Sequence, residues 1–502
     1  MQQISADVVI IGSGAGGGTV AKELAPLCRD GVRTVVLEAG PRLRDDEFTG
    51  REFEMARTLY VDGGGFLTED KSMTLAFGRA YGGSTVVYTG TSLTVTEPAI
   101  RRWGVPGLAH DDVLRRSRKY LGENHVHLLD VADLNDNNRL FADGCRTLGY
   151  RVEQFPLNLK GCTGAGVCNL GCPTGAKMGT HRVQLPEAER QGVTVVTNCT
   201  ADRIEERAVV ATVRAHTHGE PSAWQPGEYR ISAKAVVVAG GAVGSPALLL
   251  RSRLSASLPA LGRYFTCHPA LILVAQHERP ITNYAGHPKS YYCDHFADSD
   301  GFLLETCMYF PFTTAKSLTG FGADHSRMMS AMDRLQMILV LAIDPPEPDN
   351  RVLVDRAGRP VVRYAFTEQV RQSLVRAMRA SARIFFAAGA ARVHAPASSR
   401  FFIEASEAGR IDDLIPTSGL TLGKVAIASA HPMGGCRMGS DAATSVTDAW
   451  GQVHGVPWLF AADASLFPRC AEINPYITIM ALADRVAERV RGRLPDLRAS
   501  TP

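Results

Sequence analysis

The chain has 502 residues, a length that favours two domains or one large α/β unit with an inserted second region. Its composition, with 45% hydrophobic and 21% charged residues, is typical of globular proteins. With 54 basic against 51 acidic residues and a net charge of +3, we expect no binding to nucleic acid or membrane surfaces, and no apolar run approaches the ~20 residues of a membrane span.

The first 40 residues have the pattern of a βαβ unit, in which a glycine-rich turn joins a strand to a helix. Its glycines fall as Gly12-x-Gly14-x-x-Gly17. Gly12 permits the tight turn, Gly14 lets the backbone approach a pyrophosphate, and Gly17 lets the helix pack on the strand. The predicted strand, helix and second strand cover residues 7–11, 19–25 and 33–37.

Glu38 ends the second strand about 20 residues after the glycines, where a carboxylate can accept hydrogen bonds from a ribose diol. Ala15 lies within the glycine turn, and the N-terminus of the helix that follows faces the phosphates. The sequence therefore predicts dinucleotide binding and leaves FAD and NAD open. The alternative is a glycine-rich turn without a ligand.

Further along the chain, buried strands are predicted at 193–197 and 235–239, and the second leads into another glycine turn and helix. Residues 256–425 lack such junctions and carry alternating runs at 271–276, 337–343 and 351–364, which favour a largely antiparallel sheet. The end of the chain has the strand-and-helix pattern of the first 40 residues again, with a strand at 458–463 and a helix at 477–490.

The predicted class is therefore α/β, with a Rossmann-like domain on a parallel sheet that is discontinuous in sequence, and a second α+β substrate domain on a largely antiparallel sheet. The first domain is predicted to comprise residues 1–255, with lid and cysteine-rich loop insertions, and residues 426–502. The substrate domain is predicted at 256–425.

Four other motifs follow the first turn in a fixed order. They are GRAYGGST at 78–85, GAVGSP at 241–246, AHPMGGC at 430–436, and DASLFP at 463–468 followed by NPYIT at 474–478. This series resembles that of the glucose-methanol-choline (GMC) oxidoreductases, closest in style to the cholesterol oxidase, long-chain alcohol oxidase and sugar dehydrogenase branches. The resemblance implies FAD as the cofactor.

The resemblance also implies which residues contact FAD. The GRAYGGST turn resembles one whose backbone lines the flavin and pyrophosphate, Ala201 lies where the family places an adenine-contacting backbone, and Asp463 matches an acid that faces the ribityl chain. Tyr88 stands where relatives often carry Asn, and we expect a buried ring whose hydroxyl has a partner, with a substrate contact as the alternative. The expected FAD-binding residues are Gly12, Gly14, Ala15, Gly17, Glu38, Arg79, Gly83, Ser84, Ala201, Asp463, Asn474 and Pro475.

The same resemblance makes His431 and Asn474 the catalytic residues. Hydride leaves an alcohol carbon for flavin N5 only if the hydroxyl proton is taken, and histidine, with an ordinary pKa of ~6.5, is neutral near pH 7. Asn474 would hold the same oxygen. His268, in a Thr-Cys-His-Pro stretch where the family usually reads Asp-His-Pro, is expected to be structural. The expected reaction converts an alcohol to an aldehyde or ketone, with oxygen or an electron carrier as the final acceptor.

Cys162, Cys168 and Cys172 lie close together in a glycine-rich loop. Some GMC sugar dehydrogenases carry a three-cysteine iron-sulfur cluster in this region, so a cluster is one expectation. The alternative is a loop packed by small thiols, and a zinc site is less favoured because only His181 offers a fourth ligand. Eleven scattered cysteines and an N-terminus without a basic region and cleavage site predict a cytoplasmic protein.

Three other functions remain open at this point. The first is an iron-sulfur-containing FAD dehydrogenase of sugars or polyols that passes electrons to a carrier. The second is an FAD-containing hydroxynitrile lyase, and the third is a flavin-binding scaffold for another subunit, against which the intact His and Asn pair argues. The identity of the alcohol and the oligomeric state are not predicted, because specificity lies in the variable second domain.

Overall fold

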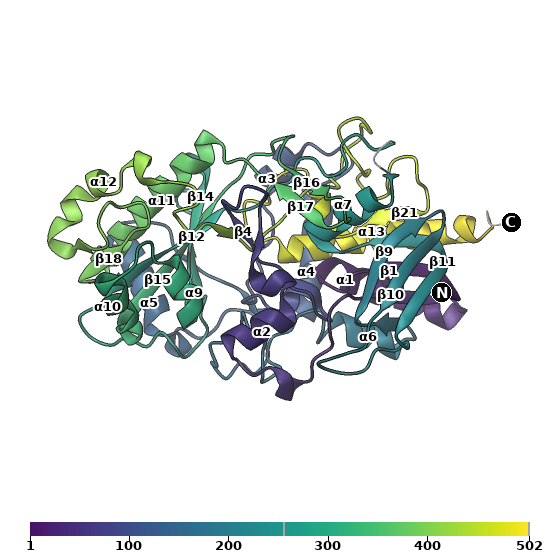
Figure 1. Cartoon of the computed structure of the whole chain (residues 1–502), viewed down its shortest axis with the longest axis horizontal. Helices are drawn as coiled ribbons and strands as arrows, with labels where there is room; N and C mark the ends of the chain where they lie inside the picture. The colour runs from purple at the N-terminus through teal and green to yellow at the C-terminus, as the bar shows by residue number, and fades with distance from the viewer. Residues whose placement is uncertain (255–256, 500–502) are drawn as a thin grey trace.

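The computed structural model describes residues 1–254 and 257–499. Two sheet-based lobes lie side by side along the long axis, and the N- and C-termini lie together at the far end of one lobe (Figure 1). Within the described residues, no helix is sufficiently long and apolar to span a membrane.

The lobe that holds both termini is built on a sheet that, among the described residues, has seven strands in the order β8-β2-β1-β11-β10-β9, with β21 also paired to β11. The pairs β8-β2, β2-β1, β1-β11 and β11-β21 are parallel, whereas β11-β10 and β10-β9 are antiparallel. The predicted parallel sheet, assembled from both parts of the chain, is confirmed, and the antiparallel strands extend it. The bounds are β1 (Gln2–Ile11), β2 (Thr34–Leu37), β8 (Thr194–Val196), β9 (Cys199–Glu205), β10 (Ala208–Val213), β11 (Gly227–Val238) and β21 (Leu459–Ala461).

Helices from distant parts of the sequence pack on this sheet. α1 (Ala15–Leu24) follows β1 and lies against α13 (Tyr476–Ala499), which also contacts α4 (His110–Glu123) and β11. α7 (Gly241–Arg251) follows β11 in the same way that α1 follows β1. Each strand-to-helix junction therefore carries one of the two predicted glycine turns.

The second lobe contains a mostly antiparallel sheet in the order β3-β4-β20-β12-β15-β14-β13-β6, with β18 and β19 attached beside β12. α11 (Glu368–Ala387) covers it and packs against α5 (Asp136–Thr147). The bounds are β3 (Phe66–Leu67), β4 (Thr74–Leu75), β6 (Glu153–Gln154), β12 (Ala270–Gln276), β13 (Tyr291–Cys293), β14 (Phe302–Thr306), β15 (Leu335–Ala342), β18 (Arg392–His394), β19 (Ile403–Glu404) and β20 (Ala428–Ser429).

This second sheet also draws short strands from residues before 256 and after 425. The predicted boundary between residues 255 and 256 lies outside the described residues, and the three domain segments stay a prediction.

The run at 351–364 forms a separate hairpin, β16 (Arg351–Val354) and β17 (Pro360–Arg363), beside α7. The remaining elements are α2 (Glu52–Leu59), α3 (Glu97–Trp103), α6 (Gln184–Arg190), α8 (Ala297–Asp300), α9 (Pro311–Ser317), α10 (Ala323–Met329), α12 (Ile411–Leu414), β5 (Val126–His127) and β7 (Leu157–Asn158).

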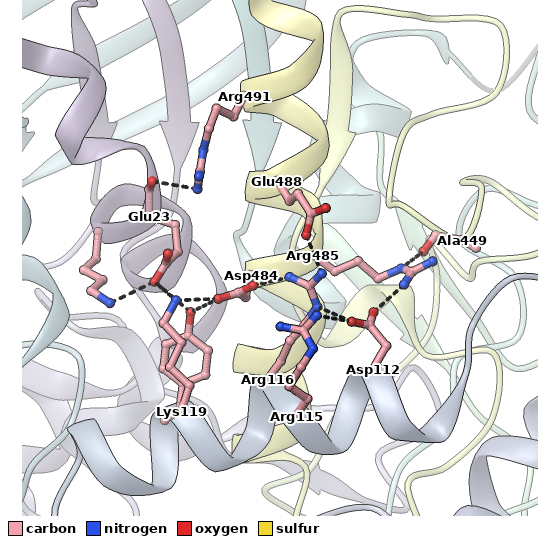
Figure 2. Close-up of polar contacts among 12 residues, drawn as sticks. Glu23, Asp112, Arg115, Arg116, Lys119, Ala449, Asp484, Arg485, Glu488 and Arg491 are labelled. Atoms are coloured by element: carbon pink, nitrogen blue, oxygen red, sulfur yellow. Dashed lines mark hydrogen bonds and ion pairs between the residues drawn. The ribbon is translucent and has the colours of Figure 1, made fainter. Parts of the chain in front are cut away.

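A network of charged side chains joins α4 to α13 and α1 (Figure 2). Asp484 of α13 accepts hydrogen bonds from Lys119 Nζ at 2.8 Å and from Tyr120 Oη at 2.6 Å, and it pairs with Arg116. Lys119 also reaches Glu23 of α1, at 2.6 Å. Because α13 begins just after Asn474, this network holds in place the helix that follows the second predicted catalytic residue.

We expect Asp484→Asn to lower the free energy of unfolding by about 1.5–3 kcal/mol, because it weakens the hydrogen bonds of this carboxylate while Asp112 and Glu488 still pair with Arg116. Chemical denaturation would measure the change. Asp111→Asn, on the exposed face of α4, is the matched control and should change stability by less than about 0.5 kcal/mol. Equal stabilities of the two variants would contradict a structural role for the network.

Candidate functional site

The first glycine turn has no room for side chains. Gly12 has φ +102°, and a Cβ there would lie 2.2 Å from the carbonyl oxygen of Ala239. A Cβ on Gly17 would lie 1.9 Å from the carbonyl oxygen of Gly12. Gly14 is the N-cap of α1 and supplies no side-chain cap, so the N–H groups of the first turn, which starts at Ala15, point out of the helix without a side-chain partner. This is the geometry of an anion site.

Glu38 is buried beside this turn. Its Oε2 accepts hydrogen bonds from the N–H and hydroxyl of Ser13, at 3.0 and 2.6 Å, and its Oε1 accepts one from the N–H of Gly40 at 2.7 Å. Burial raises the pKa of the carboxyl, although these donors and the charge of Arg79 act to lower it. A carboxylate has about four acceptor positions, so one remains for a ribose hydroxyl.

The Gly-Gly-Ser turn touches the first glycine turn. Gly83 has φ +53°, and a Cβ there would lie 2.7 Å from the Cα of Gly14. Ser84 is exposed, and its hydroxyl accepts a hydrogen bond from the N–H of Gly78 at 2.9 Å. Arg79 is also exposed. The two predicted pyrophosphate-lining turns are thus brought together by the fold.

Asp463 joins the end of β21 to the second glycine turn. Its carboxylate accepts hydrogen bonds from the N–H of Gly241 at 2.8 Å, the hydroxyl of Ser245 at 2.5 Å and the N–H of Ser465 at 2.7 Å. Burial raises its pKa. These bonds show Asp463 bracing the start of α7, and a contact with the ribityl chain stays a prediction.

Ala201 is buried in β9, where the register with β10 shifts at Val210 and Ala211. Its carbonyl oxygen accepts a weak hydrogen bond from Arg251 at 3.4 Å. Its contact with adenine stays a prediction.

Tyr88 has the hydroxyl partner expected from the sequence, and its ring is partly rather than fully buried. It packs on Tyr476 with ring centroids 4.9 Å apart, and its hydroxyl accepts a hydrogen bond from the Asn158 amide. Burial raises its pKa well above the usual value. Since Tyr476 directly follows Pro475, the contact also supports the segment that carries Asn474, and both Asn474 and Pro475 are buried.

His431 lies on a loop held from two sides. On one side Met433 and Thr266 exchange backbone hydrogen bonds of 2.8 and 2.9 Å. On the other side the N–H of Gly434 donates to the carbonyl of Ala464 at 3.0 Å. His431 itself is half-buried, so part of it stays accessible to a substrate.

The pairing with Thr266 brings His268 next to His431. The two Nδ1 atoms lie 2.9 Å apart, and the rings are nearly perpendicular, at 81°. Sequence reasoning treated His268 as structural, and only the Thr-Cys-His-Pro stretch marked it. The direct pairing of His431 with Asn474 stays a prediction.

Both imidazoles are held in the neutral form. Burial and the charge of Lys289 lower the pKa of His431 to about 3, and burial and His431 lower that of His268 to about 3 while Glu305 acts to raise it. Lys289 and Glu305 form an ion pair whose side chains are only 9% and 1% exposed. In its neutral form an imidazole has one unprotonated ring nitrogen, which is able to accept a proton.

A family model described as GMC oxidoreductase matches residues 56–270, and a second model with the same description matches residues 346–483. The chain belongs to the GMC oxidoreductase family. An uncharacterized GMC-type oxidoreductase of Mycobacterium tuberculosis is 32% identical over 506 residues, which cover 98% of this chain and 77% of that protein. A long-chain-alcohol oxidase of Arabidopsis thaliana is 26% identical over 526 residues. The matched region covers 97% of this chain and 68% of that protein.

Solved structures of other GMC-like enzymes share this fold. Pyridoxine 4-oxidase from Mesorbium loti superposes with a TM-score of 0.71 at 19% identity. The superposition covers 97% of this chain and 99% of the pyridoxine 4-oxidase chain. A formate oxidase of Aspergillus oryzae, studied for FAD modification, also has a TM-score of 0.71, at 15% identity and with 99% of this chain covered. Membership of the family makes this chain an FAD-dependent oxidoreductase, and the uncapped α1 terminus and the remaining acceptor position on Glu38 fit the pyrophosphate and ribose of FAD.

The iron-sulfur cluster found in some GMC enzymes is not supported here. Across residues 1–254 and 257–499, no group of three or more His, Cys, Asp or Glu side chains is placed to hold a metal ion. Lys177 instead lies against this loop, and its Nζ donates to the Cys168 carbonyl at 2.5 Å and to the Tyr88 carbonyl at 2.8 Å. The loop spacing allowed a cluster, but the described structure instead shows the buried Lys177 side chain bonded to backbone carbonyls of Cys168 and Tyr88.

Proposed function

We propose that this enzyme oxidises an alcohol to an aldehyde or ketone, with His431 as the proton acceptor. The observation that carries the proposal is an accessible histidine, kept neutral by its surroundings, on a loop fixed to the segment that leads into Asn474 and α13. The glycine turns and Glu38 would hold FAD, which supplies the hydride acceptor. The relatives named for long-chain alcohols support an alcohol as the substrate.

In this reaction the hydroxyl O–H bond of the substrate breaks as a new N–H bond forms on His431. Removing this proton raises the electron density on the carbinol carbon and so favours loss of hydride. The amide of Asn474 would orient the same oxygen without titrating. We also propose a cytoplasmic location, where the cysteines, which the structure shows as free thiols, would stay reduced.

Anaerobic titration of the purified holoenzyme with aliphatic, steroid and sugar alcohols tests the proposal. Bleaching of the oxidised flavin by one class identifies the substrate type and eliminates a hydroxynitrile lyase, which requires no net redox change. Readmitting oxygen, or adding an artificial electron acceptor, then separates an oxidase from a dehydrogenase. Iron and sulfide assays on the same sample decide the sugar dehydrogenase alternative. If no alcohol reduces the flavin, the proposal fails and a flavin-binding scaffold is favoured.

The pKa of His431 predicts the pH dependence of the reaction. A base acts only in its unprotonated form, and a pKa of about 3, below the ordinary ~6.5, keeps that form populated in mildly acidic solution. We therefore expect the rate of flavin reduction to be flat from about pH 5 to 8 and to fall only as the pH approaches the lowered pKa. Stopped-flow reduction at a series of pH values measures this, and an acid limb centred near ~6.5 would contradict it.

A further inference from the structure

The contact between His268 and His431 limits how His431 can act. Because Nδ1 of His431 faces Nδ1 of His268 at 2.9 Å, only Nε2 of His431 is left to meet a substrate. Neutral imidazole carries one hydrogen, on either nitrogen, and the hydrogen bond made by one nitrogen decides the state of the other. Whether His431 is a base therefore depends on its neighbour.

His268 does not have the contacts of an ordinary structural histidine. It is fully buried, and its Nε2 has no hydrogen-bond partner among the described residues, so Nδ1 makes its only side-chain hydrogen bond. The segment that carries it is firmly held, because Asp344 accepts hydrogen bonds from the Thr266 hydroxyl at 2.9 Å and the Cys267 N–H at 3.3 Å. The fold thus fixes His268 against His431.

Two arrangements of hydrogens satisfy this contact. In the first, His431 donates from Nδ1 to His268, and Nε2 of His431 has a free lone pair. In the second, His268 donates, and Nε2 of His431 carries the hydrogen and cannot accept another. A free histidine side chain prefers its hydrogen on Nε2, so His431 on its own would favour the second state.

The proposed alcohol oxidation requires the first arrangement, because only there can Nε2 of His431 accept the substrate proton. The ammonium of Lys289 acts on His431, and the carboxylate of Glu305 acts on His268. Lys289 therefore disfavours additional positive charge on His431, and Glu305 favours it on His268. The Lys289 and Glu305 ion pair is nearly inaccessible to water, which leaves its field weakly screened.

We propose that His268 is a positioning residue that accepts the Nδ1 hydrogen of His431 and so leaves Nε2 of His431 free to take the substrate proton. The proposal rests on the proposed alcohol oxidation. It adds a second histidine to the site, one that never touches the substrate and acts by selecting the tautomer of the first.

The direct test is ¹⁵N NMR of the histidine-labelled holoenzyme in the oxidised state, with the signals of His431 assigned by their loss in His431→Gln. We expect an unprotonated Nε2 and a protonated Nδ1 in the wild type. In His268→Ala the hydrogen should move to Nε2. In His268→Asn the amide oxygen lies near the position of Nδ1 and should restore the wild-type pattern. A protonated Nε2 in the wild type, or an unchanged pattern in His268→Ala, would overturn the proposal.

Kinetics supply the second readout. We expect His268→Ala to slow anaerobic flavin reduction by about 10²-fold or more at saturating alcohol, because a wrongly protonated histidine is a poor base. His268→Asn should recover most of this loss. His277→Asn, which alters a histidine paired with Gln336, is the control and should change neither the ¹⁵N pattern nor the rate.

The outcomes separate the two proposals. If His431→Ala abolishes reduction while His268→Ala reacts normally, His431 remains the base and the positioning role fails. If no alcohol reduces the flavin, the oxidation proposal fails, and the ¹⁵N pattern still decides which nitrogen of His431 carries the hydrogen. Should His268→Ala not fold, the wild-type spectrum and His268→Asn suffice to reject the proposal.

Discussion

Replacing His431 with alanine is expected to leave FAD bound while slowing anaerobic flavin reduction by an alcohol substrate by roughly 10²–10⁴-fold. The loss arises because the hydroxyl proton no longer has an acceptor as the hydride leaves. The imidazole is not one of the groups around the glycine turns or Glu38, so the flavin content should not change. Single-turnover reduction and the visible spectrum of the purified variant measure the two quantities.

A control for this variant is His127→Ala, which removes an exposed imidazole far along the sequence from either glycine turn. It should reduce its flavin at the wild-type rate. Normal reduction in His431→Ala would remove His431 from the mechanism, whereas loss of FAD from that variant would point to a structural role.

Gly17→Ala is expected to produce a protein that is purified with little or no FAD. The new Cβ would lie 1.9 Å from the carbonyl oxygen of Gly12, a backbone atom that cannot move aside without shifting β1. α1 must therefore retreat from the strand, and its N-terminus retreats from the pyrophosphate with it. Overpacking of this kind typically costs about 1–3 kcal/mol of stability as well. Flavin content and thermal unfolding measure these effects.

Gly492→Ala, within α13, is the matched glycine substitution. A Cβ there meets no atom within 4 Å, so the variant should keep its FAD. It should gain up to about 1 kcal/mol, because alanine is the better helix former. Full flavin content in Gly17→Ala would show that FAD binding does not depend on the close approach of Gly17 to the Gly12 carbonyl oxygen.

Much of the cofactor lobe could be predicted because its signals are local. The β-branched run before Gly12, the glycine spacing and the acid at Glu38 each specify a backbone conformation or a contact within one βαβ unit. The partner of the Tyr88 hydroxyl was also expected, and Asn158 supplies it. Strands β9 and β10 were not predicted, since an antiparallel pair beside a parallel sheet leaves no distinctive spacing.

The candidate site was harder to predict because it depends on contacts between distant segments. Nothing in the sequence around His268 indicates that Thr266 pairs with Met433, and this pairing is what places the two imidazoles together. The three loop cysteines show the same limit. Their spacing allowed either a cluster or a loop packed by thiols, and it could not reveal that Lys177 bonds to the Cys168 carbonyl.

The parallel pairing of β21 with β11 has a consequence for biosynthesis. β1, β2 and β11 emerge from the ribosome long before β21 and α13, against which α1 packs. A nascent chain can therefore form the dinucleotide turn early, but the lobe lacks its closing strand and helix until β21 and α13 have been synthesised. Flavin loading should accordingly follow the synthesis of these two elements, and ribosome-bound intermediates that lack them should expose the face of α1 that α13 later covers.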